Sequence, residues 1–370
     1  MQDLLVAVGA ARYLDHDVVL DLDDLHPASH AAMQIQVSLD DQDLISSADP
    51  QVGLLHRSAE KLFEARDYRQ IMMLANRHDW LSAFSSELGV ALTVESAMGI
   101  IPPPRATWTR TLLAEMNRVS ASLLLLGAPT NDLPLLQLRE RFLTLQEMAS
   151  GGRVHPMINR IGGLAHPITA PWLTELAILT NELRAQLPAI TEATEAATAP
   201  FAGRAVLTRT NAITYGVTGP VGRASGLDLD LRRDETYLAY GDLAELLIVP
   251  TSSDGDLPAR YRMLIEQLPV SINLMTACTE FVLGDGAINV PLPKVVKVPE
   301  STSYGQVEGP LGVSGYLLVS IGEKSPWRLK LRTPSLSNVQ AMATAVVGLP
   351  MSDLGAALMS FFFVVGDIDR

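Results

Sequence analysis

Cysteine is nearly absent from this chain, in which Cys278 is the only thiol among 370 residues. A single thiol excludes an internal disulfide, a zinc site made of thiolates and an iron–sulfur cluster held by this chain alone. Any redox centre must therefore come from a partner or from a bound organic molecule. Cys278 lies inside a predicted helix, which favours a buried structural thiol.

Positive charge is also scarce, with 28 Lys and Arg against 41 Asp and Glu and a formal net charge of −13. Binding to nucleic acid requires clustered cations that neutralise phosphates, and the sequence contains no basic run. An ordinary acidic cytosolic surface is sufficient to explain this charge. The composition therefore argues against nucleic acid as a partner.

Long apolar runs are missing as well. The longest, from Ala357 to Gly366, falls well short of the ~20 residues that a membrane-spanning helix needs. The first residues have neither the basic segment nor the cleavage pattern of a signal peptide. We expect a chain that does not span a membrane itself, and that is either soluble or peripheral on the membrane subunit of a larger assembly.

Apolar residues make up 48% of the chain, which is enough to bury a large core. The pattern predicts a mainly helical α+β fold in a single domain over residues 1–370. Its parts are a small antiparallel sheet within 1–57, a helical bundle over 58–300, and a hairpin followed by a helix over 301–370.

Periodicity locates the individual elements. Strand-like patterns cover 18–22, 33–39 and a hairpin over 315–332. The Ala/Thr/Glu-rich stretch 187–203 is either a frayed helix or a surface connection, and it lacks the Gly, Ser or Pro tract of a linker. Apolar residues at helical spacing predict helices over 58–75, 82–100, 105–126, 135–149, 171–186, 257–281 and 353–363.

The most specific pattern lies in residues 26 to 82 and continues in a fixed order further along the chain. Its motifs are His26-Pro27-Ala28-Ser29-His30, Asp49-Pro50-x-x-Gly53-x-x-His56-Arg57, Arg66-x-Tyr68-x-Gln70, Arg77-His78-Asp79-Trp80, Asn159-Arg160-Ile161-Gly162-Gly163 and Thr218-Gly219-Pro220-x-x-Arg223. This order resembles the D subunit of the respiratory NADH:quinone oxidoreductase, complex I. The fold of that family is similar to the large subunit of nickel–iron hydrogenases, and the resemblance therefore implies a hydrogenase-like helix bundle.

His26 and His30 flank the proline of the first motif. Taken alone, the two are either a metal site or ordinary loop histidines. The resemblance implies that both belong to a quinone-binding site and that His30 contacts the quinone headgroup. It also implies that Asp132 orients His30, because a carboxylate on one ring nitrogen sets the tautomer and raises the proton affinity of the imidazole. His30 and Asp132 are thus the predicted catalytic residues.

Trp80 departs from the family, which usually reads Arg-Met-Asp-Tyr where this chain reads Arg77-His78-Asp79-Trp80. In the family the tyrosine is the second ligand of the headgroup and the presumed proton donor. An indole N–H can donate a hydrogen bond to a quinone oxygen, but it has no usable acidity near neutral pH. Trp80 is therefore predicted to bind quinone without supplying the proton. Further departures cluster near the histidines, at Asp24, Ala31 and Gln34.

Nickel chemistry is excluded by four positions. Nickel–iron large subunits hold their metal with two Cys-x-x-Cys pairs, and the matching positions here are Asp79 with Ser82 and Val364 with Asp367. Without a thiolate, nickel has no ligands. We expect no metal and no cluster bound by this chain.

Arg110, Glu115 and Arg118 follow one another at helical spacing. They are either ion pairs on a helix surface or, as the resemblance implies, charges that hold the bundle together and support the cluster-bearing neighbour. The sequence alone leaves both alternatives open.

The resemblance implies a function within an assembly. The chain would be a peripheral-arm subunit of a proton-translocating NADH:quinone oxidoreductase, on the cytoplasmic face of the membrane, with no activity alone. Quinone would bind between this chain and a small iron–sulfur cluster subunit, and further partners would be the other peripheral-arm subunits and the quinone-channel membrane subunit. The alternative is a non-catalytic scaffold subunit of a related membrane-bound redox complex, motivated by the substitutions at Trp80 and around His30.

Overall fold

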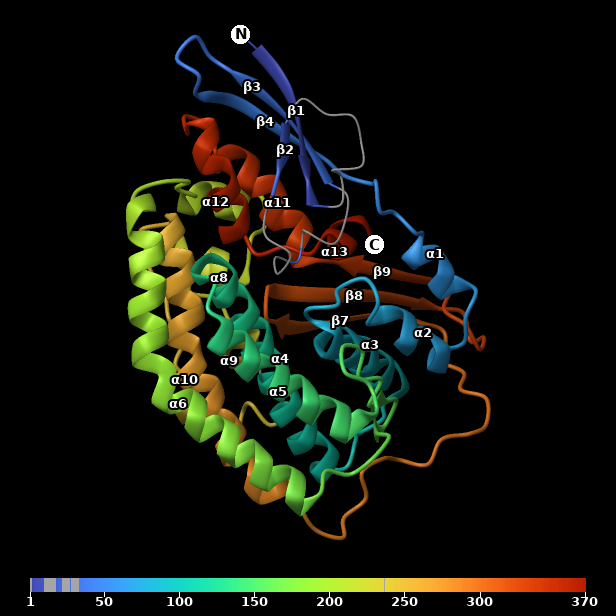
Figure 1. Cartoon of the computed structure of the whole chain (residues 1–370). Coiled ribbons are helices and arrows are strands. Elements are labelled where there is room, and N and C mark those ends of the chain that lie inside the picture. Colours follow the sequence, from blue (N-terminus) through green and yellow to red (C-terminus); the bar gives the residue numbers. More distant parts are fainter. Residues whose placement is uncertain (1, 10–17, 22–26, 28–32, 236) are drawn as a thin grey trace.

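The computed structural model describes residues 2–9, 18–21, 27, 33–235 and 237–370. The mainly helical α+β class is confirmed. A small sheet stands at the N-terminal end, a bundle of long helices forms the body, and a second sheet packs against the bundle beside the C-terminus (Figure 1).

The bundle is organised around α4 (Pro104–Thr130), which is buried over most of its length. Helix α10 (Leu257–Val282) packs along α4, and α6 (Ala170–Thr198) packs beside α10 (Figure 1). Helices α3 (Ala83–Met98) and α5 (Leu133–Ser150) complete the bundle. Because α4 is enclosed by neighbours, its apolar residues occupy all sides and do not form a single stripe.

Helix α6 decides between the two alternatives for residues 187–203. The helix runs without interruption to Thr198, so most of this stretch is regular helix and not a surface connection. Alanine and glutamate are strong helix formers. In addition, Ile190, Thr194 and Thr198 recur at intervals of four and are buried, which fixes this part of the helix against its neighbours.

The N-terminal sheet has the strand order β2-β1-β3-β4. Its strands are β1 (Gln2–Val8), β2 (Val18–Leu20), β3 (Met33–Leu39) and β4 (Ile45–Gln51). β1 pairs with β3 in antiparallel fashion but with β2 in parallel, so the sheet is mixed and not wholly antiparallel as expected. β4 lies at the edge of the sheet, where its proline, Pro50, removes no hydrogen bond from a central ladder.

The predicted C-terminal hairpin is part of a three-stranded antiparallel sheet. β8 (Gly312–Ser320) and β9 (Arg328–Arg332) form the predicted hairpin, and β7 (Ser301–Gly309) pairs with the other edge of β8. The sheet packs on α3 (Figure 1). A Cβ at Gly89 would overlap the ring of Tyr316, so this glycine allows the close approach of helix and sheet.

Shorter elements join these parts. The predicted helix over 58–75 is divided in two, because Asp67 begins a new helix with a capping box that it forms with Gln70. These two helices are α1 (Ala59–Glu64) and α2 (Tyr68–Ala75), and the other short elements are β5 (Asn159–Arg160), β6 (Gly163–Leu164), η2 (Ala199–Phe201), α7 (Arg209–Thr214), α8 (Gly219–Ala224), α9 (Leu231–Asp234), η3 (Ala244–Leu246), α11 (Pro334–Ala345), η4 (Met351–Asp353), α12 (Leu354–Ser360) and α13 (Val365–Asp369).

The charges of α4 are buried and paired. Arg110 forms a two-pronged ion pair with Glu95 of α3, at 2.8 and 2.9 Å. Glu115 accepts two hydrogen bonds from Arg232 on α9, each of 3.1 Å, and Arg118 donates to the backbone oxygens of Glu308 and Gly309. These side chains therefore hold the bundle together and are not surface pairs.

The network extends beyond α4. Arg232 also pairs with Asp230 at 2.7 Å, and Arg223 bridges Asp230 and Glu308 at 3.3 and 3.1 Å. Three guanidinium groups and three carboxylates are thus buried together and balance in charge. The set consists of Glu115, Arg118, Arg223, Asp230, Arg232 and Glu308.

Cys278 is buried in α10, as expected. Burial raises the pKa of its thiol to about 12, and the charge of Glu115 acts in the same direction. The thiol is therefore protonated and inert at neutral pH.

We predict that Arg232→Ala destabilises the fold by about 3–5 kcal/mol, because it leaves Glu115 and Asp230 buried without their cation. Arg233→Ala is the matched control. Its side chain is 35% exposed and pairs with Asp228 and Asp234, so its loss should cost less than about 1 kcal/mol. Urea unfolding of the subunit and its recovery in the assembled complex measure both effects. Equal losses for the two variants would contradict a structural role for the network.

Candidate functional site

The turn before α3 carries the predicted site residue Trp80, and its conformation is fixed by Asp79. The carboxylate of Asp79 accepts hydrogen bonds from the backbone N–H groups of Leu81 and Ser82, at 3.1 and 3.0 Å. An aspartate often shapes a turn by bonding backbone groups two or three residues ahead. From α4, Asn117 donates to the backbone oxygen of Leu81 at 3.0 Å and holds the turn from the other side.

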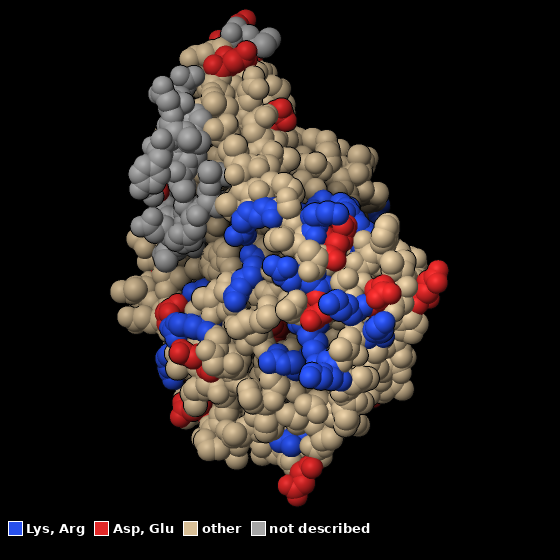
Figure 2. All heavy atoms as spheres, turned by 90° about the vertical axis from the view of Figure 1, so that its right-hand side faces the viewer, with Lys and Arg blue, Asp and Glu red and all other residues tan. Residues whose placement is uncertain are grey.

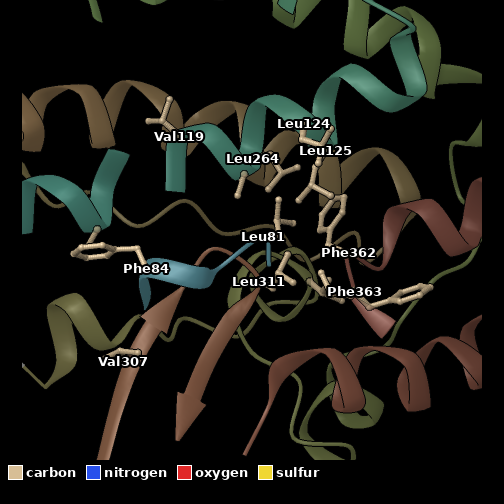
Figure 3. Close-up of a cluster of buried hydrophobic side chains, with 14 of the residues drawn as sticks. Leu81, Phe84, Val119, Leu124, Leu125, Leu264, Val307, Leu311, Phe362 and Phe363 are labelled. Carbon is tan, nitrogen blue, oxygen red and sulfur yellow. The ribbon is translucent and has the colours of Figure 1, made fainter. Parts of the chain in front are cut away.

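Leu81 anchors this turn in the hydrophobic core. Figure 3 shows its side chain among Leu264 of α10, Leu311 and Phe362, with Leu124 of α4 nearby. The leucine is 4% exposed. Since cores are close-packed, residues 79 and 80 beside this anchor have little freedom to move.

His78 pairs with Asp367 of α13. The ring nitrogen Nδ1 of His78 lies 2.9 Å from Oδ1 of Asp367, and the other carboxylate oxygen accepts from the N–H of Ser335 at 3.2 Å. Gly366 lies against the backbone oxygen of His78, where a Cβ would collide. The C-terminal helix is thereby bound to the turn that carries Trp80.

The charges of His78 and Asp367 act on the nearby carboxyl group of Asp79. Burial raises the pKa of Asp79 to about 7, and the negative charge of Asp367 adds to the rise while His78 opposes it. A carboxyl group with such a pKa is partly protonated at neutral pH. Tyr316 on β8 faces the same carboxylates, and its pKa is raised by burial and by both negative charges.

Trp80 itself is half-buried. It lines a small hollow between α4 and α5, together with Asn117, Ser120, Ala121, Arg139, Leu143, Gln146 and Val154. Burial lowers the pKa of Arg139. The lining of this hollow thus combines the aromatic ring of Trp80 with amide, hydroxyl, guanidinium and aliphatic groups.

Asp132 occupies a different place. It caps α5, where its carboxylate accepts from the N–H of Leu135 at 3.0 Å. This position is seven residues before Arg139, or about 10 Å along the helix, and Asp132 does not line the hollow beside Trp80. His26 and His30 lie outside the described residues, so the partnership of His30 with Asp132 stays a prediction.

The pair His78–Asp367 was not predicted as a functional feature. A signal for it lay in the resemblance, which implies that the four positions matching the hydrogenase thiolates lie close together in the fold. Asp79 and Asp367 are two of these positions, and they do converge here. From the sequence, the absence of cysteine at these positions indicated only that the chain does not bind nickel.

Two surface features lie outside this site. A groove of about 790 Å³ opens between α2 and the segment 157–166, and Met72, Met73, Arg69, Arg160 and Leu292 are among its lining residues. Figure 2 shows many Lys and Arg side chains on the face that carries α1, α2 and β9. Hollows of about 430 and 320 Å³ there are lined in part by Lys61, Arg328, Lys330, Arg332 and Arg370.

Within the described part of the chain, no helix is both long and apolar enough to cross a membrane. The same residues contain no group of three or more His, Cys, Asp or Glu side chains arranged to hold a metal ion.

Fold and site together define a class of protein. It is a mainly helical α+β protein in which a rigid turn and a C-terminal segment meet and bring two carboxylates and an imidazole together.

Comparison with known proteins gives the family. Residues 126–297 and 287–370 match the family described as "Respiratory-chain NADH dehydrogenase, 49 Kd subunit". The chain is 47% identical to the second of the NADH-quinone oxidoreductase D subunits of Salinispora tropica, over 100% of this chain and 98% of that protein. For the first D subunit of Streptomyces coelicolor the identity is 47%, over 99% and 98%. For the D subunit of Clostridium beijerinckii it is 33%, over 96% and 97%.

The chain therefore belongs to the D-subunit family of respiratory NADH-quinone oxidoreductase, as its motifs indicated. It is a subunit of an oxidoreductase complex. The family match covers most of the bundle and the whole C-terminal sheet, and the identity to relatives extends over the described N-terminal sheet as well.

We predict that Asp79→Asn changes how stability depends on pH. The folded-state pKa of about 7 lies above the ordinary value of 3.8, so the stabilising proton is fully bound below pH 4 and is lost as the pH rises through 7. Over this window the wild-type protein should lose up to about 1.4 kcal/mol of stability per pH unit more than Asp79→Asn. Urea unfolding between pH 4 and pH 8 measures the difference.

The matched control for this experiment is Asp228→Asn, whose carboxylate is exposed and pairs with Arg233. It should follow the wild-type pH dependence. If Asp79→Asn also follows the wild type, Asp79 does not hold a proton in the folded state.

Proposed function

We propose that this chain, together with an adjacent small iron–sulfur cluster subunit, forms the quinone-reducing site of a proton-translocating NADH:quinone oxidoreductase on the cytoplasmic face of the membrane. Electrons arrive from the cluster of the partner and reduce quinone at the shared interface. The observation that carries this proposal is the rigid turn 78–82, which holds the half-buried Trp80 in place, the residue that the resemblance identifies as a headgroup ligand. The relatives are named for quinone reduction.

Each site residue has a distinct role in this proposal. His30 contacts one oxygen of the quinone headgroup, with His26 beside it, and Asp132 orients the imidazole of His30. Trp80 supplies an aromatic wall and the hydrogen bond of its indole N–H. Because indole does not release its proton near neutral pH, another group must donate the proton that the family's phenol supplies.

The groove beside α2 supports the proposed partner. Met72 and Met73 line the groove with flexible apolar side chains, and the side chain of Met73 is 48% exposed. Methionine-rich surfaces adapt to partners, and arginine is enriched in protein interfaces. We assign this groove to the iron–sulfur cluster subunit, and we assign other faces to the remaining peripheral-arm subunits and to the quinone-channel membrane subunit.

The alternative is a non-catalytic scaffold subunit of a related membrane-bound redox complex. Two observations favour it: Trp80 lacks a transferable proton, and Asp132 already serves as a helix cap. The buried ion pairs around α4 would hold the fold equally well in either case.

Three substitutions distinguish the two functions in the assembled complex. We expect His30→Ala to abolish most quinone reduction. Trp80→Phe should cost the ~0.5–1.5 kcal/mol of one neutral hydrogen bond, which corresponds to between about twofold and tenfold in rate. Trp80→Tyr should equal or exceed the wild type, because a phenol adds a proton source in nearly the same shape. Steady-state quinone reductase assays measure all three.

Trp327→Phe is the control, since Trp327 is 64% exposed and lies outside the site. It should leave the rate unchanged. The scaffold function requires that no substitution at residues 30 or 80 alters electron flow. Unchanged turnover in His30→Ala, with the complex fully assembled, would refute the quinone site.

A further inference from the structure

His78, Asp79 and Asp367 form a buried cluster that the proposed function does not yet use. Their exposed fractions are 4%, 1% and 0%. By the resemblance, the tetrapeptide Arg77-His78-Asp79-Trp80 differs at two places from the Arg-Met-Asp-Tyr of the family. This chain lacks the tyrosine and has an imidazole two residues earlier, where methionine is usual.

No permanent cation among the described residues pairs with the two carboxylates of this cluster. Arg57 approaches from the segment before α1, but its guanidinium donates to the backbone oxygen of Arg77. Arg332 on β9 attracts Asp367 only at longer range, and its bonds go to Val313, Gly216 and Thr218. Two carboxylates buried together without a bonded cation retain at least one proton between them and the imidazole.

Three polar atoms around the cluster have no hydrogen-bond partner among the described residues. They are Nε2 of His78, Oγ of Ser82 and the hydroxyl of Tyr316, and all three are buried. Nε2 is the nitrogen opposite the one that faces Asp367. The imidazole can therefore accept a proton on one side and release it on the other, as histidine does in proton shuttles.

We propose that the cluster of His78, Asp79 and Asp367 is the proton source for quinone reduction in this chain, in place of the phenol that Trp80 lacks. Asp79 stores the proton, Asp367 relays it to Nδ1 of His78, and His78 passes a proton on from Nε2. The inference rests on the proposed function, because it requires a quinone bound beside Trp80.

Two electrons from the partner's iron–sulfur cluster, delivered one at a time, reduce the quinone. The N–H bond at Nε2 of His78 breaks as an O–H bond forms at one quinone oxygen, Asp367 returns a proton to Nδ1 across the 2.9 Å contact, and the O–H bond of Asp79 breaks to replace that proton. Asp79 is left as a carboxylate and recovers its proton from solvent. The second quinone oxygen takes its proton from the ring N–H of His30, which breaks as the second O–H bond forms, and His30 regains a proton from solvent.

A double-mutant experiment in the assembled complex tests this proposal. The variants are His78→Met, Trp80→Tyr and the two combined, with quinone reductase activity measured from pH 6 to pH 9. We expect His78→Met to lower kcat by about 100-fold, the usual contribution of a general acid, with little change in KM. In the Trp80→Tyr background the same substitution should cost less than about threefold, because the phenol supplies the proton.

His78→Gln keeps an N–H donor for Asp367 but cannot carry a proton. It should lower kcat as His78→Met does, and it replaces that variant in the comparison if His78→Met assembles poorly. The pH profile gives a second readout. The activity of the wild type should fall as the pH rises through the range in which the cluster loses its proton, and that fall should be absent in Trp80→Tyr with His78→Met.

The experiment separates failure of the proton-source proposal from failure of the quinone site itself. If His78→Met costs the same with Trp80 as with Tyr at residue 80, the imidazole only maintains the structure and the proton-source proposal is wrong. If His30→Ala and His78→Met both leave the rate unchanged in a complete complex, the quinone site itself is wrong.

Discussion

The pairing of charge inside the bundle is the constraint on which this fold depends. Helix α4 runs through the core with Arg110, Glu115 and Arg118 fully buried, and a buried charge is tolerated only where a partner neutralises it. Arg232 meets that requirement for Glu115 and Asp230 at once. The network therefore fixes how α4, α9 and β7 lie relative to one another, and the turn that carries Trp80 is bonded to the same helix through Asn117.

The cluster of His78, Asp79 and Asp367 is not neutralised by guanidinium groups, unlike the network around α4. In the network around α4 three guanidinium groups meet three carboxylates, so no proton needs to move. At the turn, two carboxylates meet one imidazole, and charge balance depends on protons. The same burial thus produces rigidity in one place and a titratable group with a pKa near neutrality in the other, and such groups concentrate at functional sites.

Much of the fold could be predicted from the sequence, because local patterns specify local structure. The predicted strand 33–39 and the helices near 82–100 and 257–281 agree closely with β3, α3 and α10. β4 contains serines and a proline, and only its place at the sheet edge makes it a strand. The site was less predictable. His78 and Asp367 are 289 residues apart, and no local pattern reveals that they meet. The resemblance located Trp80 and implied that the positions of Asp79 and Asp367 lie close together, but it assigned no role to His78.

Infrared difference spectroscopy of the assembled complex during a single turnover tests most directly whether the buried cluster supplies a proton to quinone. In the wild type, the C=O band of a protonated carboxyl group should disappear in step with quinol formation at neutral pH, and Asp79→Asn should lack that band from the start. Quinol formation with no change in any carboxyl band would show that the proton comes from elsewhere, and would contradict a proton-donating role for Asp79.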